Sequence, residues 1–531
     1  MGATKILIRV MALGTFVVVL DNTIMNVSIS ALVKDLGTTV SGVQAAIALN
    51  ALMMAAFVLM GGKLADIIGM RRAFLLGAVI YITGSLLASF SNNLSVFILG
   101  WCAIQGFGAA MMLPNVTTII RTNIPAGRAR ATAYGTMAGI NALGMAIGPL
   151  IGGFLTTYFS WRWAFRLEVF FLAIVLLMSS VIPKDVLGKI RPKLDKIGVM
   201  WQAAAMMFIV LGILLAANYG LLFAKQPLVM FGYEFSFFGL SIVPLLLGLG
   251  ISCLGMFVRS ERSAEAKHKD VLVDLALIKI KQFVRGLNIR FLQIALVAGT
   301  TFVVPLYLQV TYGLSAFATG LILLSFTAGL LITSLGASRY GQKYSAKQKI
   351  RTGFLVAIGG LLILVAYVAT GDSAGGIAPG IFVYGLGLGL VTSQIVNTIM
   401  ATVPANKTAE ASGVTSTLET LGSSVGTAVV GTVLVVALTG FAGKLVAQSA
   451  VFPPESKNQI SEQMDTSIEV VSDQVLSDAI QENGAYEEEA IRIYDQARRN
   501  AFIVTLVFMA FTALASYLLA NKIQNTSPVR A

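Results

Sequence analysis

Long apolar stretches that carry almost no charge recur along the whole chain of 531 residues. Each is close to the roughly 20 residues that a helix needs to cross the hydrocarbon core of a bilayer. We therefore predict about fourteen membrane-spanning helices, at residues 6–30, 43–62, 73–91, 94–120, 131–157, 163–182, 197–217, 235–258, 287–310, 316–337, 351–370, 376–402, 409–441 and 500–520. The first stretch follows Lys5 and Arg9 but lacks a small-residue cleavage site, so we expect it to remain as a helix.

Composition and charge support an all-α polytopic membrane protein. The chain is 56% hydrophobic and 12% charged, and its net charge is +13. With the amino terminus inside, about 29 of the 38 Lys and Arg fall on the cytoplasmic side, which the positive-inside rule requires. We therefore expect a multi-pass protein of the plasma membrane with both termini cytoplasmic. The basic residues need no nucleic acid partner to explain them.

Two polar insertions interrupt the apolar pattern. Residues 259–290 are basic and partly amphipathic ("VLVDLALIKIKQFV"), which predicts a linker along the cytoplasmic membrane surface. Residues 442–499 hold about eleven of the 25 Asp and Glu, with apolar residues at helical spacing. We expect a small extracellular helical hairpin there, between helices 13 and 14. A solvated cap is the favoured role for it, and a substrate gate is the alternative.

Several classes of chemistry find no support in the sequence. Cys102 and Cys253 both lie inside apolar stretches, which favours neither a disulfide nor a metal site, and the single histidine, His268, lies in a polar connection. No phosphate-binding loop of the form G-x-x-x-x-G-K-[ST] occurs, and no polar cluster typical of a membrane enzyme is present. We expect no enzyme activity, no metal and no cofactor. Any proton carried within the membrane must then be carried by carboxylates.

Three acidic residues interrupt apolar helices and are the candidates for that task. Asp21 lies within "LDNTIMN", and the helical rise places it and Glu168 at about the same depth in the outer half of the membrane. Glu419 should lie near the midplane. Buried acids are costly and usually functional, so we predict that Asp21, Glu419 and Glu168 bind protons or a cationic substrate. A structural pairing is the alternative for each, for Glu168 with Arg166.

Two glycine-containing motifs suggest moving parts. In "GGKLADIIGMRR", Gly62, Asp66, Gly69 and Arg71 predict a latch in which a carboxylate pairs with a helix terminus and a basic residue. In "GMAIGPLIGG", small residues four apart allow close helix packing and a proline bends the helix. The residues of this second motif are Gly144, Gly148, Pro149, Gly152 and Gly153.

These motifs resemble those of the major facilitator superfamily. The first resembles the cytoplasmic loop signature of that family, although Ile67 and Met70 replace two usual arginines. The second resembles the antiporter signature of drug exporters. Three further stretches resemble patterns of the fourteen-helix drug:proton antiporter branch: "LDNTIMNVSIS", "SWRWAF" and "PLYLQVTYGLSAFATGL". That branch usually has an arginine in its fourth helix, and this chain has Cys102 at the corresponding position.

The resemblance implies the major facilitator fold, with two six-helix bundles and an inserted helix pair. We expect the amino-terminal bundle at 1–182, the inserted pair with its linker at 183–258, the amphipathic linker at 259–286 and the carboxy-terminal bundle at 287–531. It further implies a monomeric, proton-coupled antiporter that exports hydrophobic, cationic compounds by alternating access. The proton gradient would be its only energy source.

Polar side chains expected in the substrate cavity are Asn22, Gln105, Asn115, Asn141 and Tyr307. Each could equally be a helix-packing residue. The substrate also stays open, because export of an endogenous lipid, peptide or metabolite would use the same fold. Acids in the cavity favour cationic compounds over lipids.

Overall fold

A computed structural model describes residues 2–524 apart from ten gaps. The residues outside the description are 1, 126–127, 186–194, 225–227, 231–232, 236–238, 268–270, 340–343, 372, 405–406, 453–483 and 525–531. Within the described part, fourteen helices are long and apolar enough to cross a membrane, which confirms the predicted number. The chain is a multi-pass membrane protein.

The first half of the chain forms one bundle of helices. Its fourth span is continuous but changes character, since an α-helical turn leads into a π-helix, η1, and then into a second α-helix. The elements are α1 (Gly2–Val27), the short α2 (Ile29–Leu36), α3 (Val40–Ile68), α4 (Met70–Ser89), α5 (Leu94–Phe97), η1 (Ile98–Gln105), α6 (Gly106–Asn123), α7 (Arg128–Tyr158), α8 (Arg162–Leu177) and the 3-10 turn η2 (Met178–Val181). Glycines allow α4 and the fourth span to touch closely, because a Cβ on Gly84 would lie 2.6 Å from the carbonyl oxygen of Gly100.

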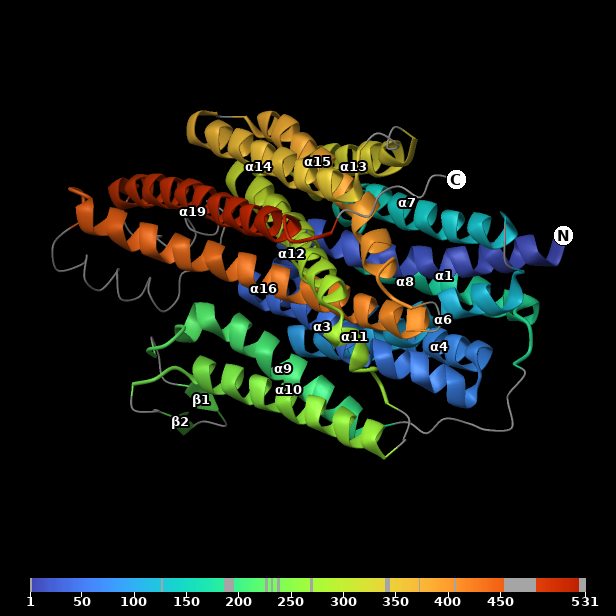
Figure 1. Ribbon diagram of the computed structural model, residues 1–531. Helices are drawn as coiled ribbons and strands as arrows, with labels where there is room; N and C mark the ends of the chain where they lie inside the picture. The colour runs from blue at the N-terminus through green and yellow to red at the C-terminus, as the bar shows by residue number, and fades with distance from the viewer. Residues whose placement is uncertain are drawn as a thin grey trace.

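Two helices and a small hairpin follow, and they pack against each other beside α3 and α16 (Figure 1). These elements are α9 (Lys196–Tyr219), β1 (Leu228–Met230), β2 (Tyr233–Phe235) and α10 (Ile242–Ala266). The two strands pair antiparallel, with Val229 opposite Glu234. The helix α10 continues about eight residues beyond the predicted span, so the connection that follows is shorter than the basic stretch in the sequence suggested. Its described residues contain the short α11 (Ala276–Lys279).

The second bundle comprises six long helices, and two of them extend well beyond the apolar spans. They are α12 (Lys281–Tyr312), α13 (Ala316–Arg339), α14 (Ala346–Thr370), α15 (Ile377–Met400) with the preceding turn η4 (Ala374–Gly376), α16 (Thr408–Gln448) and α19 (Gly484–Ala520). The predicted extracellular hairpin centres on residues 453–483, which lie outside the described residues. Part of the polar insertion is instead helical continuation of α16 and α19.

Both chain termini lie at the same end of the bundle, called here the near end, and the opposite end is the far end (Figure 1). At the far end the two bundles contact each other directly. Gln309 of α12 donates a hydrogen bond to the Val27 carbonyl (2.8 Å), and the Phe317 N–H donates to Thr157 Oγ1 (3.1 Å). Along α3 and α16, Ser424 donates to the Ala48 carbonyl (2.7 Å). The halves are therefore closed together at the far end.

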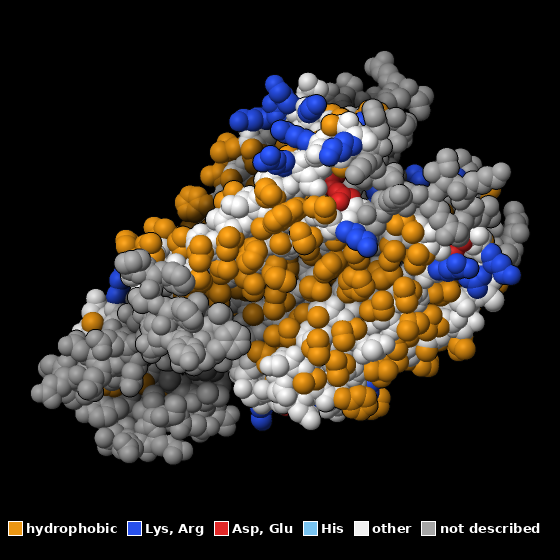
Figure 2. Space-filling view, turned by 90° about the horizontal axis from the view of Figure 1, so that it is seen from below, with side chains coloured by type: hydrophobic (Ala, Val, Ile, Leu, Met, Phe, Trp, Pro, Cys, Tyr) orange, Lys and Arg blue, Asp and Glu red, His pale blue; other side chains and the backbone are white. Residues whose placement is uncertain are grey.

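The surface has the polarity expected of a membrane protein. Figure 2 shows a broad area of hydrophobic side chains with Lys and Arg gathered towards its borders. On α9 and α10, large apolar residues such as Met200 and Ile251 are more than half exposed. In a bilayer these side chains contact lipid tails and not water, so their exposure is expected for membrane-spanning helices.

Candidate functional site

Two acidic residues from distant helices meet inside the first bundle. Asp21 of α1 is 3% exposed and Glu168 of α8 is fully buried. The two carboxyl groups lie close enough to interact with each other, and both lie near the Gln105 amide from η1. Two ionised carboxylates buried side by side would repel each other strongly, and a proton on one of them removes that repulsion. The arrangement therefore favours a pair that carries one proton.

The neighbouring donors differ between the two carboxyl groups. Trp101 Nε1 donates to both oxygens of Asp21, at 3.0 and 3.1 Å. Glu168 Oε2 accepts from Ser85 Oγ (3.1 Å) and Gln105 Nε2 (3.3 Å), whereas no donor among the described residues reaches Oε1. A proton on Glu168 Oε1 would leave each of these hydrogen bonds in place, whereas Asp21 accepts a hydrogen bond on both of its oxygens.

The side chains that reach the carboxyl pair from the fourth span lie in the π-helix. A π-turn inserts one extra residue into a helix and often occurs at functional sites. In η1, Trp101 and Gln105 are four residues apart and both face the carboxyl pair. Cys102, where the family resemblance predicted an arginine, turns to the other side and donates its thiol to the Ala46 carbonyl (3.1 Å). No cation from the described residues pairs with Asp21.

Glu419 does not join this pair. It lies on α16 in the second bundle, where it accepts a hydrogen bond from Arg290 Nε of α12 at 2.7 Å. Arg290 also donates to Gln293 Oε1 (2.6 Å), and Gln293 donates to Thr392 Oγ1 (2.8 Å). The Glu419 side chain is 28% exposed, so it combines an ion pair with access to solvent.

The polar residues expected in a common cavity are spread over several places. Asn115 is buried and donates to the Met111 carbonyl within its own helix (2.6 Å), while Asn141 is exposed. Asn22 is exposed and donates to the Val18 carbonyl (3.0 Å). Of these candidates, only Gln105 contacts an acidic candidate, Glu168.

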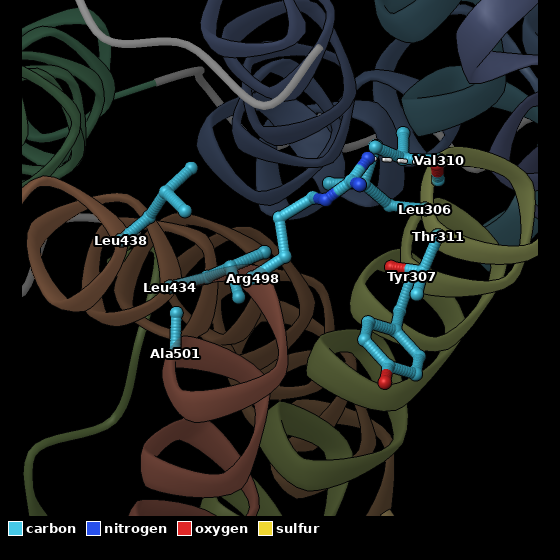
Figure 3. Close-up of a pocket in the computed structure, with 8 residues that line it drawn as sticks. All are labelled: Leu306, Tyr307, Val310, Thr311, Leu434, Leu438, Arg498 and Ala501. Carbon is cyan, nitrogen blue, oxygen red and sulfur yellow. Dashed lines mark hydrogen bonds between the residues drawn. The ribbon is translucent and has the colours of Figure 1, made fainter. Parts of the chain in front are cut away.

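Tyr307 lies within the second bundle, in a pocket between α12, α16 and α19 (Figure 3). Its ring stacks on Phe502, with centroids 3.9 Å apart. The pocket is otherwise apolar except for Thr311 and the buried Arg498, whose guanidinium reaches across it to donate to the Val310 carbonyl (2.9 Å). This pocket is separate from the contact between the two bundles.

A small cavity does lie between the two bundles. Its lining comes from α1, α7, α12 and α13 and mixes hydroxyl and amide groups with apolar side chains: Thr23, Asn26, Met145, Pro149, Thr301, Leu323, Phe326 and Thr327. Thr23 and Asn26 belong to the same helix as Asp21 but face the cavity, whereas Asp21 faces Trp101 and Glu168. The helix α1 therefore connects the cavity to the buried acids.

The glycine motif of α7 lines this contact between bundles. A Cβ on Gly144 would meet Val19, one on Gly148 would meet Thr23, and one on Gly152 would meet Ile24, so this face lies against α1. Gly153 faces the other way, onto α13, and the Pro149 carbonyl lies against Gly320 of α13. The motif lets one helix pack closely against both bundles.

At the near end, the predicted latch is described only in part. Gly69 has φ = +102°, a conformation that favours glycine, and it joins α3 to α4. The N–H groups of Arg71 and Arg72 donate to the Asp185 carboxylate (2.9 and 3.3 Å), which thereby caps α4. Gly62 lies in α3 near Pro114, and the Asp66 side chain lies outside the described part.

A second near-end contact ties the connection after α10 to the second bundle. Lys407, just before α16, forms an ion pair with Asp274. The hydrogen bond from Lys407 holds the pKa of Asp274 below its ordinary value of 3.8. On the other side, Glu261 of α10 accepts from the N–H groups of Leu272 (2.9 Å) and Val273 (3.2 Å).

Sequence reasoning missed several of these residues. Trp101 carried no signal of its own, because aromatic residues are common in membrane helices. Arg290 lies in the predicted ninth span, but its partner is 129 residues away. Asp185 follows Pro183 in a short connection, and only the three-dimensional fold brings it to the start of α4.

Comparison with known proteins gives a consistent set of relatives. The model of the Major Facilitator Superfamily matches residues 11–427. The chain is 29% identical to a protein described as a probable actinorhodin transporter of Streptomyces coelicolor, over 78% of this chain and 69% of that one. It is 26% identical to the multidrug efflux pump LfrA of Mycolicibacterium smegmatis, over 89% and 88% of the two chains. Among solved structures, a bacterial homologue of the lysosomal transporter Spinster, inward-facing and unoccupied, matches with a TM-score of 0.61 at 13% identity, covering 98% of this chain and 97% of that one.

Proposed function

Because the chain belongs to the major facilitator superfamily, and is thus a membrane transporter and not an enzyme, we propose that it exports drugs in exchange for protons. The proposed substrates are hydrophobic, cationic compounds. Relatives described as multidrug efflux pumps support the export of drugs. The Asp21–Glu168 pair is the observation that carries the proton coupling, because two carboxyl groups buried side by side are suited to bind and release a proton.

The geometry suggests how substrate and proton affect each other. A compound in the cavity between the bundles would contact Thr23 and Asn26 on one face of α1, and Asp21 lies on another face of the same helix. A cation there is attracted by the negative charge of the pair, since charges in a low-dielectric interior interact over longer distances than in water. Proton release would thus favour cation binding, and proton binding would favour cation release.

Glu419 is a second proposed site for a cationic substrate. Its carboxylate is partly exposed, and Arg290 holds it through a single guanidinium nitrogen. A cationic compound could compete with Arg290 for this carboxylate. In that arrangement Arg290 occupies the carboxylate when no substrate is bound.

The remaining expectations belong to the same proposal. We expect a monomer in the plasma membrane with both termini cytoplasmic, driven by the proton gradient without a cofactor. The alternative substrate, an endogenous metabolite, lipid or peptide, draws support from the relative described as a probable actinorhodin transporter. The mixed lining of the cavity, with hydroxyl and amide groups beside apolar side chains, would accept an aromatic metabolite as well as a drug.

The test uses proteoliposomes that contain the full chain and a fluorescent cationic dye. We expect dye addition to release protons from the wild type, and Asp21→Asn and Glu168→Gln to abolish that release. Glu419→Gln should weaken dye binding. The control Glu265→Gln makes the same acid-to-amide change at an exposed position of α10 and should behave as wild type. Proton release that persists in both Asp21→Asn and Glu168→Gln would refute the carboxyl mechanism, and a parallel screen of metabolites and lipids would separate the substrate classes.

A further inference from the structure

Four buried aromatic rings, called here the aromatic plug, pack together in the first bundle. They are Phe97, Trp101, Trp161 and Phe165, and none is more than 2% exposed. Phe97 lies at the centre, with its ring centroid 5.1 Å from Trp101, 5.4 Å from Trp161 and 5.9 Å from Phe165. Such close packing of rings leaves little room for water.

The aromatic plug lies between the carboxyl pair and the far-end surface. On the surface side, Trp161 Nε1 donates to Asp35 Oδ2 at 3.0 Å, and the Asp35 side chain is 40% exposed. On the inner side, Trp101 Nε1 donates to both oxygens of Asp21. A proton that travelled from the far end to Asp21 along this line would have to pass the plug.

We propose that Trp101 is a proton gate, which locks the aromatic plug while Asp21 is ionised and loosens it when Asp21 is protonated. The inference rests on the proposed proton coupling and adds to it a residue that blocks leakage. A hydrogen bond to an ionised carboxylate is about twice as strong as one between neutral groups. The lock is therefore tightest when the pair has discharged its proton. In that state, a proton that reached Asp21 from the far end would dissipate the proton gradient without moving a substrate.

The groups around Asp21 are consistent with this switch. The titratable side chains whose charges interact with it are Glu168 from α8, Tyr81 from α4 and Cys102 from η1. Buried phenol and thiol groups without a neighbouring cation are neutral near pH 7. Among the described residues, Glu168 is therefore the neighbour whose ionisation competes with that of Asp21.

The experiment measures proton leak without any substrate, in proteoliposomes that hold the full chain, an internal pH dye and a pH gradient. Trp101→Phe keeps an aromatic ring in the plug but removes the N–H donor. We expect its leak to rise about tenfold, the factor that corresponds to about 1.4 kcal/mol in a barrier. Trp163→Phe, at a position of α8 that is 46% exposed, is the matched control and should leak as wild type does.

Two further variants separate a gate from general loosening. Trp101→Phe combined with Asp21→Asn should return the leak to the wild-type rate, because the path requires the carboxyl. Phe97→Leu thins the plug and leaves the Trp101 N–H in place, and it should also leak. A wild-type leak in Trp101→Phe, whatever the leak of Phe97→Leu, or a leak that persists in the double variant, would overturn the gate. Because no substrate is used, this result is independent of whether the chain exports drugs, which the dye assay decides.

Discussion

The far-end contact between α7 and α13 provides a direct test of how the two bundles separate. A methyl group added at Gly153 would lie 2.5 Å from the Ala316 carbonyl oxygen and 2.7 Å from the Phe317 Cα. A carbon and a carbonyl oxygen normally approach to about 3.3 Å, so Gly153→Ala must push the helices apart by about 1 Å. Such overpacking costs about 1–3 kcal/mol. The cost applies only while the far end is closed, and it should therefore raise the far-open population by about 5- to 150-fold.

The assay is the labelling of a cysteine introduced at Asn26, which is 6% exposed and lines the cavity between the bundles. An impermeant thiol reagent added from the far side should react faster in Gly153→Ala than in the parent. The native Cys102 and Cys253 are buried and give little background. Gly139→Ala is the matched control on the same helix, because a methyl group there meets no atom within 4 Å. Equal labelling rates in Gly153→Ala and Gly139→Ala would refute the reasoning.

Three further changes test contacts nearer the other end. Arg290→Met should lower the free energy of unfolding by about 1.5–3 kcal/mol, measured by thermal unfolding, because it removes a charged hydrogen bond to Glu419. Adding Glu419→Gln should recover part of the loss, because it removes the carboxylate left without that partner. Asp274→Asn should lower the melting temperature at pH 7. The pKa of Asp274 in the folded protein lies below its ordinary value of 3.8. The ion pair therefore stabilises the fold fully above pH 3.8, and this stabilisation is lost as the pH falls through the folded pKa. The melting temperatures of the wild type and Asp274→Asn should therefore converge in acid. Gly69→Ala should lower the free energy of unfolding by about 1–3 kcal/mol, because φ at this position is +102°. Gly62→Ala should lower it less, because a Cβ there would have its nearest neighbour at 3.8 Å. Equal melting temperatures for the two variants would contradict this reasoning.

Much of the fold could be predicted from the sequence, because a bilayer imposes a simple rule on length and polarity. The number of membrane helices followed from that rule, and the end points did not. The helix α16 runs to Gln448 although its apolar stretch ends near residue 441, since a helix can continue into water once its start is fixed. The sequence also could not show η1, because a π-turn depends on how neighbouring helices hold it.

The candidate site was predicted in part. The helical rise suggested that Asp21 and Glu168 lie at similar depth, but depth does not say which faces of α1 and α8 meet. That depends on side-chain packing between residues 147 positions apart in the chain. The ion pair between Arg290 and Glu419 was missed for the same reason. Tyr307 was expected in the cavity, and its stacking on Phe502 could not be read from either segment alone.

The π-helix has a consequence for the length of the fourth span. A π-turn absorbs one extra residue, so deleting one residue between 98 and 105 would let the segment become an ordinary α-helix while the flanking turns keep their places. Trp101 and Gln105 would still share a face, because residues three or four apart in an α-helix lie together, but their positions relative to Asp21 and Glu168 would shift. The spacing of this segment is therefore as much a part of the site as its side chains, and substitutions alone would not reveal it.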